Sequence, residues 1–67
     1  MTRREAELYE NIKIFISNNG YSPSVRELAN CIGTNSTHHV HDMLSKLRDE
    51  GYINYIDKLP RTITITK

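Results

Sequence analysis

The chain has 67 residues, with nine Lys and Arg against eight Asp and Glu, and its formal net charge at pH 7 is +1. A chain of this length folds as one small domain, here residues 1–67, and is too short for a second module or a large enclosed substrate cavity. It contains no apolar run of roughly 18 residues and no signal-peptide core, so we expect a cytoplasmic protein without membrane contacts.

The first predicted helix begins at a capping box, in which the Thr2 hydroxyl and the Glu5 carboxylate satisfy free amides of the first turn. It runs to about Asn18, and Gly20 supplies the left-handed residue that ends it. Apolar residues recur at helical spacing and predict the face that packs on the core; they are Leu8, Tyr9, Ile12 and Ile16.

The second predicted helix follows a loop, because Pro23 biases Ser22 to extended conformations. A second capping box, Ser24 with Glu27, opens a short helix that ends at Ile32. The residues expected to point inward from it are Val25, Leu28, Ala29 and Ile32.

Two other residues of the second helix need a particular environment. Arg26 lies in the exposed first turn, where the helix dipole disfavours a cation, so we expect it to meet an external anion or Glu27. The only cysteine, Cys31, cannot form an internal disulfide and falls where a helix would have an apolar residue. We therefore expect Cys31 to be a buried structural thiol.

The third predicted helix spans about residues 36–50, with Asn35 or Ser36 as its N-cap and Gly51 as its stop. Its apolar stripe consists of Val40, Met43, Leu44 and Leu47. The opposite face carries short hydrogen-bonding side chains, namely His38, His41, Asp42, Ser45 and Asp49, with His39 and Lys46 on one flank. The turn 33–35 contains glycine and joins the second and third helices as a helix-turn-helix.

Two predicted strands follow, at 52–56 and 62–66, both rich in β-branched or aromatic residues. The connection 57–61 is polar and carries Lys58 and Arg61, so the pair forms a hairpin with a basic tip. Three helices followed by such a hairpin define the α+β winged helix-turn-helix fold, in which the hairpin is the wing. The hairpin also covers the core, through Ile53, Ile63 and Ile65.

Separated motifs occur at specific spacings along nearly the whole chain. They are GYSPSVRELA at 20–29, Gly33, STxxVHxxLxxL at 36–47, EGYI at 50–53 and KLPRTI at 58–63. This pattern resembles the N-terminal DNA-binding domain of the LexA family of SOS-response repressors, and is most similar to the Gram-positive type. The resemblance implies a winged helix-turn-helix whose third helix reads operator bases, with backbone contacts near Arg4, Arg26 and the wing. The base-reading positions it implies are Ser36, His38, His39, His41 and Asp42.

The chain also departs from the family. LexA repressors continue through a linker into a self-cleaving serine/lysine peptidase domain, whereas this sequence stops at Lys67. His38 and His39 replace what are more often small hydroxyl residues, and Thr34 replaces an apolar one. We expect no autoproteolysis and no other enzyme activity, and interpret the chain either as an excised LexA-like domain or as a stand-alone regulator of a phage or other mobile element. The divergent recognition helix favours the second interpretation.

The sequence therefore predicts binding of double-stranded DNA for transcriptional control. Imidazoles can donate to guanine acceptors, and Asp42 can accept from the amino group of cytosine. A lone winged helix buries little surface, so a palindromic operator would require a homodimer or a partner regulator. If the histidines bind as cations, affinity should rise from pH 7.5 to about 6. The residues expected to hold the backbone are Arg4, Arg26, Thr37, Lys46, Lys58 and Arg61.

Two other interpretations stay open. The near-neutral charge is unusual for a DNA binder, so the fold could instead serve as a protein-interaction module that binds another regulator. It would do so through the winged-helix frame itself or through Ile14 and Phe15, which lie off the first helix's apolar stripe. His38, His41 and Asp42 have helical spacings that could share a metal, but structural zinc usually needs four ligands, including thiolates. We expect neither a metal nor another cofactor.

Overall fold

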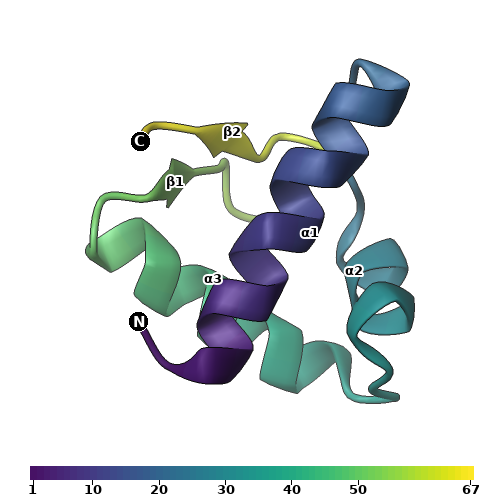
Figure 1. Cartoon of the computed structure of the whole chain (residues 1–67), viewed down its shortest axis with the longest axis vertical. Coiled ribbons are helices and arrows are strands. Elements are labelled where there is room, and N and C mark those ends of the chain that lie inside the picture. The colour runs from purple at the N-terminus through teal and green to yellow at the C-terminus, as the bar shows by residue number, and fades with distance from the viewer.

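A computed structural model describes residues 1–67 and shows three helices followed by a two-stranded antiparallel hairpin (Figure 1). The predicted winged helix-turn-helix fold is confirmed. The elements are α1 (Arg3–Asn19), α2 (Val25–Ile32), α3 (Thr37–Asp49), β1 (Ile53–Asn54) and β2 (Thr64–Ile65). None of the helices has the length and apolar character needed to cross a membrane.

Both predicted capping boxes are formed. The Thr2 hydroxyl accepts from the Glu5 N–H at 3.1 Å, and the Glu5 carboxylate accepts from the Thr2 N–H at 3.3 Å. Ser24 and Glu27 make the same reciprocal bonds at 3.2 and 2.9 Å. These side chains satisfy amides that have no partner inside a helix, and so they fix where α1 and α2 begin.

Left-handed glycines end the first two helices. Gly20 has a φ of 77°, and its N–H donates to the Ile16 carbonyl, while Gly33 has a φ of 76° and donates to carbonyls of the last turn of α2. A side chain with a Cβ is strained in this backbone conformation, so glycine at both positions allows an abrupt stop. The chain then turns directly from α2 into α3.

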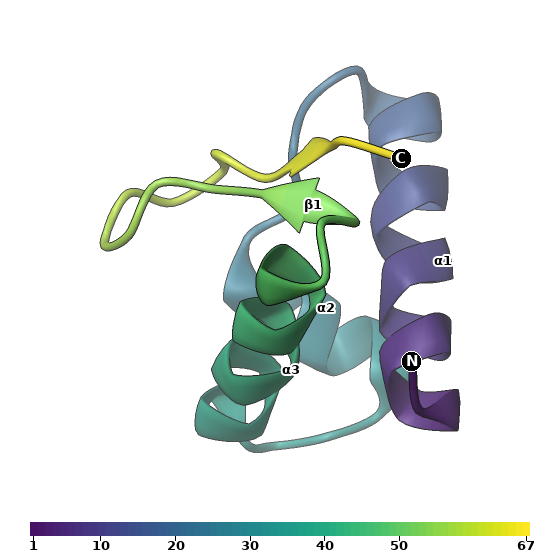
Figure 2. The same ribbon diagram turned by 90° about the vertical axis from the view of Figure 1, so that its left-hand side faces the viewer.

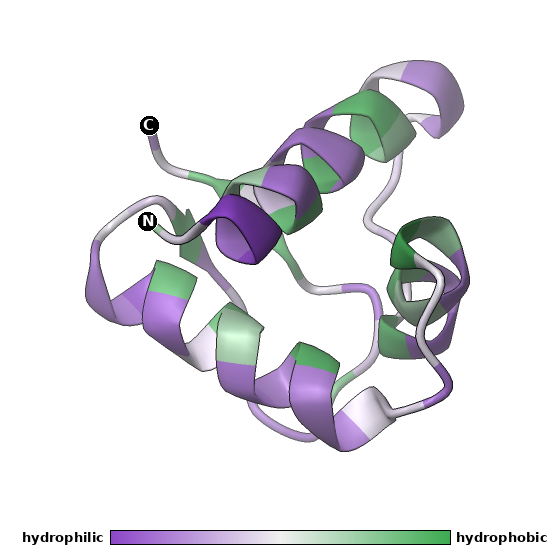
Figure 3. Ribbon diagram, turned by 60° about the horizontal axis from the view of Figure 1, so that its bottom comes forward, coloured by the Kyte–Doolittle hydropathy of each residue, from purple (hydrophilic) through white to green (hydrophobic).

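The apolar stripes of the three helices meet in one core, and the hairpin covers it. Figure 3 shows the hydrophobic residues of α3 on the side of the ribbon that faces the other helices, with hydrophilic residues on its outer side. The twelve buried hydrophobic residues are Leu8, Tyr9, Ile12, Leu28, Ala29, Ile32, Val40, Met43, Leu44, Leu47, Ile53 and Ile63. Ile16, Val25 and Ile65, also expected inside, are partly buried against this cluster.

The expectation that Cys31 would be buried is wrong, because its side chain is exposed. The buried stripe of α2 is made of Leu28, Ala29 and Ile32, and Cys31 lies off that stripe at helical spacing. An apolar residue type in a short helix was therefore not sufficient to predict an inward position.

The hairpin has shorter strands than expected. Regular pairing is limited to Ile53 with Ile65 and Asn54 with Thr64, although 52–56 and 62–66 were predicted as strands. Beyond Asn54 the Ile56 N–H donates to the Thr62 hydroxyl at 2.9 Å, a side-chain bond in place of a backbone hydrogen bond between strands. Side-chain bonds of this kind compete with regular sheet pairing. The outer part of the wing is thus an irregular loop that projects from the body (Figure 2).

Several contacts fix the base of the wing to the helices. The buried Ser22 hydroxyl accepts from the Ile63 N–H at 3.0 Å, and the Tyr9 hydroxyl donates to the Lys67 carbonyl at 2.6 Å. The Tyr9 ring also meets the Tyr52 ring edge-on, with centroids 5.4 Å apart. The wing therefore leaves the body in a defined direction, beside α3.

Candidate nucleic-acid interface

The turn before α3 sets the position of its first residues. The Thr34 hydroxyl accepts from the Ser36 N–H at 3.1 Å, and the Ser36 hydroxyl accepts from the His39 N–H at 3.1 Å. Of the two predicted N-cap residues, Asn35 and Ser36, the structure selects Ser36. The Ser36 hydroxyl keeps a hydrogen that can be donated to an outside acceptor. The free amides at this helix end attract anions.

All the predicted base-reading side chains lie on the exposed surface of α3 or at its cap. His38 and Asp42 are one turn apart, with Nε2 and Oδ2 separated by 3.7 Å, and their side chains are 89% and 62% exposed. His41 lies on the side of α3 toward the wing, where it lines a groove. His39 lies on the opposite flank, at helical spacing from Lys46.

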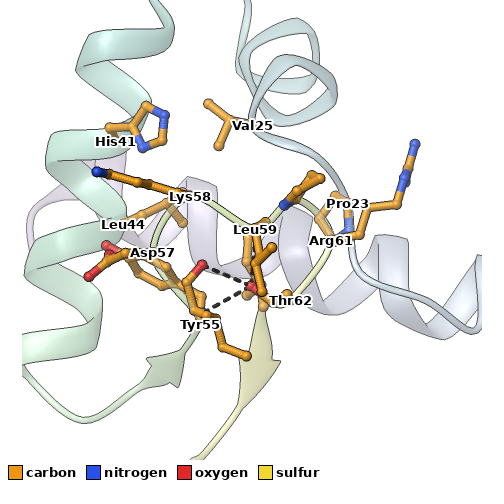
Figure 4. A pocket seen from close by; sticks show the side chains of 13 residues that line it. Pro23, Val25, His41, Leu44, Tyr55, Asp57, Lys58, Leu59, Arg61 and Thr62 are labelled. Atoms are coloured by element: carbon orange, nitrogen blue, oxygen red, sulfur yellow. Dashed lines mark hydrogen bonds between the residues drawn. The ribbon is translucent and has the colours of Figure 1, made fainter.

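A groove of about 620 Å³ separates the wing from α3 and the start of α2. His41 and Leu44 form its α3 side, and Pro23 and Val25 form its α2 side. In Figure 4 the Lys58 side chain reaches from the wing toward α3, beside His41. The fold thus brings a wing cation and a recognition-helix imidazole to one concave surface, although they lie far apart in the sequence.

The predicted backbone-binding cations fall into two groups. Arg26, Lys46 and Lys58 are exposed and belong to none of the ion pairs in the structure. Arg4 pairs with Glu7 at 3.3 Å and reaches the Ile32 carbonyl at 3.5 Å. The free cations keep their full hydrogen-bonding capacity for phosphate, whereas Arg4 already contacts acceptors of its own chain. Arg61 belongs with Arg4 in this respect.

Arg61 makes the densest set of contacts among the wing cations. Its Nη1 lies 2.8 Å from Glu27 Oε1, and its Nη2 donates to Glu27 Oε2 at 3.1 Å, which is a two-point pair. Nη1 also donates to the Ser22 carbonyl at 3.1 Å, and the guanidinium lies 5.2 Å from the Tyr21 ring centre. The Ser24 N–H and Arg61 together lower the pKa of Glu27, and the carboxylate raises the pKa of Arg61.

A second ion pair on the wing was not anticipated from the sequence. Arg48, near the end of α3, lies 3.1 Å from the Asp57 carboxylate and stacks 4.2 Å from the Tyr55 ring centre. Its spacing from Asp57 corresponds to no periodic signal, so only the folded chain reveals the contact. Arg48 and Arg61 thus connect opposite sides of the wing to α3 and α2.

The possible protein-binding residues Ile14 and Phe15 do not form one exposed apolar patch. Ile14 is 53% exposed, whereas Phe15 is half-buried and meets the Tyr21 ring at 5.7 Å between centroids. Phe15 therefore widens the packing at the end of α1, and only Ile14 of the two presents a largely free apolar side chain. No three His, Cys, Asp or Glu side chains come together in a way that could hold a metal ion.

Comparisons with known proteins agree with this architecture. Residues 1–62 match the family model described as the LexA DNA binding domain. The chain is 43% identical over 65 residues to the LexA repressor of Staphylococcus carnosus and 42% identical to that of Staphylococcus epidermidis, with 97% of the chain covered each time. These alignments cover 31% and 32% of the two repressors, so the chain spans about a third of their length. The chain belongs to the LexA DNA-binding domain family.

Proposed function

We propose that the chain binds double-stranded DNA in a sequence-specific manner and thereby represses transcription. In this proposal α3 enters the major groove, and the wing loop 57–61 lies along the sugar-phosphate backbone. The observation that carries it is the exposed polar face of α3 beside a wing whose Lys58 has no carboxylate partner. The match to LexA repressors supports the repressive role.

The start of α3 supplies the sequence-reading groups. Imidazoles of His38, His39 and His41 donate to guanine O6 or N7, and Asp42 accepts from the amino group of cytosine. Ser36 donates from the cap to a base edge, while Thr37 and the free amides of the first turn hold a phosphate. His38 and Asp42 lie 3.7 Å apart on this face, so they would meet neighbouring positions of the DNA.

The exposed cations supply an attraction that does not depend on sequence. Three of them, Arg26, Lys46 and Lys58, have no ion-pair partner, and each neutralised phosphate contributes about 0.9 to the slope of log affinity against log salt. These three predict a slope of about −3, and participation of Arg4 and Arg61 would move it to about −4.5. The measured slope of log affinity against log salt therefore gives the number of cations that contact phosphate.

A single domain of this size covers little DNA, so we propose that two copies occupy the halves of a palindromic operator, one helical turn or a multiple of it apart. Binding then depends steeply on protein concentration. A second regulatory protein that holds two copies together would produce the same site geometry. Mass measurement of the protein-DNA complex distinguishes one copy from two.

The direct test is selection of bound duplexes from a random pool, followed by fluorescence-anisotropy titration of the recovered sequence and a scrambled one. We expect an enriched motif, tighter binding of the recovered sequence, and a strong loss of affinity as salt increases. Equal binding of both duplexes, without salt dependence, would contradict the proposal. That result would favour the alternative in which the fold grips another protein.

A further inference from the structure

We infer that Arg61 is a positioning residue, which fixes the wing to the start of α2 through Glu27, and that Lys58 is the wing cation that meets phosphate. The first half of the inference concerns the free protein. The second half rests on the proposed DNA binding. The two halves are therefore tested by separate measurements.

The contacts of Arg61 engage both of its terminal nitrogens and offset its positive charge. Two of its nitrogens face the two oxygens of the Glu27 carboxylate, at 2.8 and 3.1 Å, and one of them also bonds to the Ser22 carbonyl. A two-point pair between guanidinium and carboxylate is both stronger and more directional than a single contact. While this pair is intact, Glu27 offsets the charge of Arg61 and places a carboxylate beside any phosphate that approaches it, which makes the unpaired Lys58 the more favourable phosphate ligand.

Glu27 is itself held in place, so the pair has a rigid end. Its carboxylate accepts from the Ser24 N–H at 2.9 Å as part of the α2 capping box. Next to this contact, the Ser22 hydroxyl accepts from the Ile63 N–H at 3.0 Å. The segment of the wing that leads into β2 is thus tied at Arg61 and Ile63 to residues at and just before the start of α2.

The backbone of the wing is unusual at both cations, but their side chains take different directions. Arg61 and Lys58 both adopt positive φ, at 58° and 66°, which is uncommon for residues other than glycine. Positive φ at Arg61 accompanies a side chain that turns back toward α2. Lys58 belongs to no ion pair, and Figure 4 shows its side chain extended toward the groove beside α3. The two cations therefore point to different places, although only three residues separate them.

The test uses Glu27→Gln, because glutamine can keep the capping-box bond to Ser24 while it removes the charge that Arg61 pairs with. Arg61→Lys is the second variant, since lysine keeps the positive charge but loses the two-point geometry. Glu10→Gln is the matched control, because it also removes one exposed carboxylate from an ion pair, with Lys13 at 3.5 Å on α1. Thermal unfolding establishes that each variant is folded.

In the free protein, amide hydrogen exchange reports the position of the wing. We expect the Ile63 amide to exchange at least about threefold faster in Glu27→Gln and Arg61→Lys, and at the wild-type rate in Glu10→Gln. Unchanged exchange in both wing variants, or equal acceleration in the control, would overturn the positioning role. This measurement needs no DNA, so it decides the matter even if the proposed function fails.

With the selected duplex, the sign of the effect separates the two roles. A positioning role predicts that Glu27→Gln weakens binding about two- to fivefold, although the change removes a negative charge. It also predicts that Lys58→Gln lowers the magnitude of the salt slope by about 0.9, and that adding Arg61→Gln to Lys58→Gln lowers it no further. Tighter binding by Glu27→Gln, or a slope that falls further when Arg61→Gln is added to Lys58→Gln, would show that Arg61 is itself a phosphate ligand.

Discussion

Ser22 offers the sharpest test of how the wing is held. Its side chain is buried, with 7% of the residue exposed, and its hydroxyl accepts from the Ile63 N–H at 3.0 Å while donating to the Pro23 carbonyl at 3.0 Å. Ser22→Ala removes both bonds and leaves the Ile63 amide without a protein partner. A buried donor that loses its acceptor costs about 1–3 kcal/mol of the free energy of unfolding.

That cost is large for a domain of 67 residues. For a domain of about this size, a loss of 1 kcal/mol lowers the melting temperature by about 4–8 °C, so Ser22→Ala should lower it by at least about 4 °C. The assay is thermal and urea unfolding followed by circular dichroism, with the urea data giving the free energy directly. Because the bond ties the wing to the segment before α2, we also expect faster amide exchange at Ile63.

Ser17→Ala is the matched control, since Ser17 is exposed on α1 and makes no side-chain hydrogen bond. Alanine has a higher helix propensity than serine, so this control should be neutral or slightly stabilising. The reasoning would be refuted if Ser22→Ala cost less than about 0.5 kcal/mol, because the Ile63 amide would then have found another acceptor at little cost.

Four further outcomes follow from the structure. Ser36→Ala removes the α3 cap and should cost about 0.5–2 kcal/mol in urea unfolding as well as weaken DNA binding. The exposed thiol of Cys31 should react with a thiol reagent in the folded protein, and unfolding in urea should not greatly increase the reaction rate. A thiol that reacts only after unfolding would contradict its exposure. The pKa of Glu27 is lower in the folded protein than in the unfolded chain, so ionised Glu27 stabilises the fold above the ordinary carboxyl range. The free energy of unfolding should therefore fall as the pH drops below about 4. Unfolding measured at pH 3 and pH 7 should show a smaller fall for Glu27→Gln. If histidines bind DNA as cations, anisotropy should show tighter binding at pH 6 than at pH 7.5 for wild type and a smaller change for His38→Asn. Equal changes would mean that His38 binds as a neutral imidazole or lies off the DNA.

The amino-acid sequence by itself determined the helices, because their signals are local. A capping box joins residues three apart, an apolar stripe repeats within one or two turns, and a glycine ends a helix through its own φ. Thr2, Ser24 and Ser36 cap the helices where the sequence predicted, and Gly20 and Gly33 end the first two. The resemblance to LexA rests on residue types at fixed spacing, so it too is a property of the sequence alone.

The tertiary structure decided which charged and polar groups are free. Glu27 and Arg61 are 34 residues apart, and Arg48 and Asp57 pair across the end of α3 and the wing, so no local pattern predicts either contact. The exposure of Cys31 and the short strands were decided in the same way, by the packing of α2 and by the Thr62 hydroxyl bonds within the wing. Pairing and burial depend on which distant segments the fold brings together. For that reason the sequence predicted both cations of the wing but could not distinguish Arg61, which pairs with Glu27, from Lys58, which faces the groove.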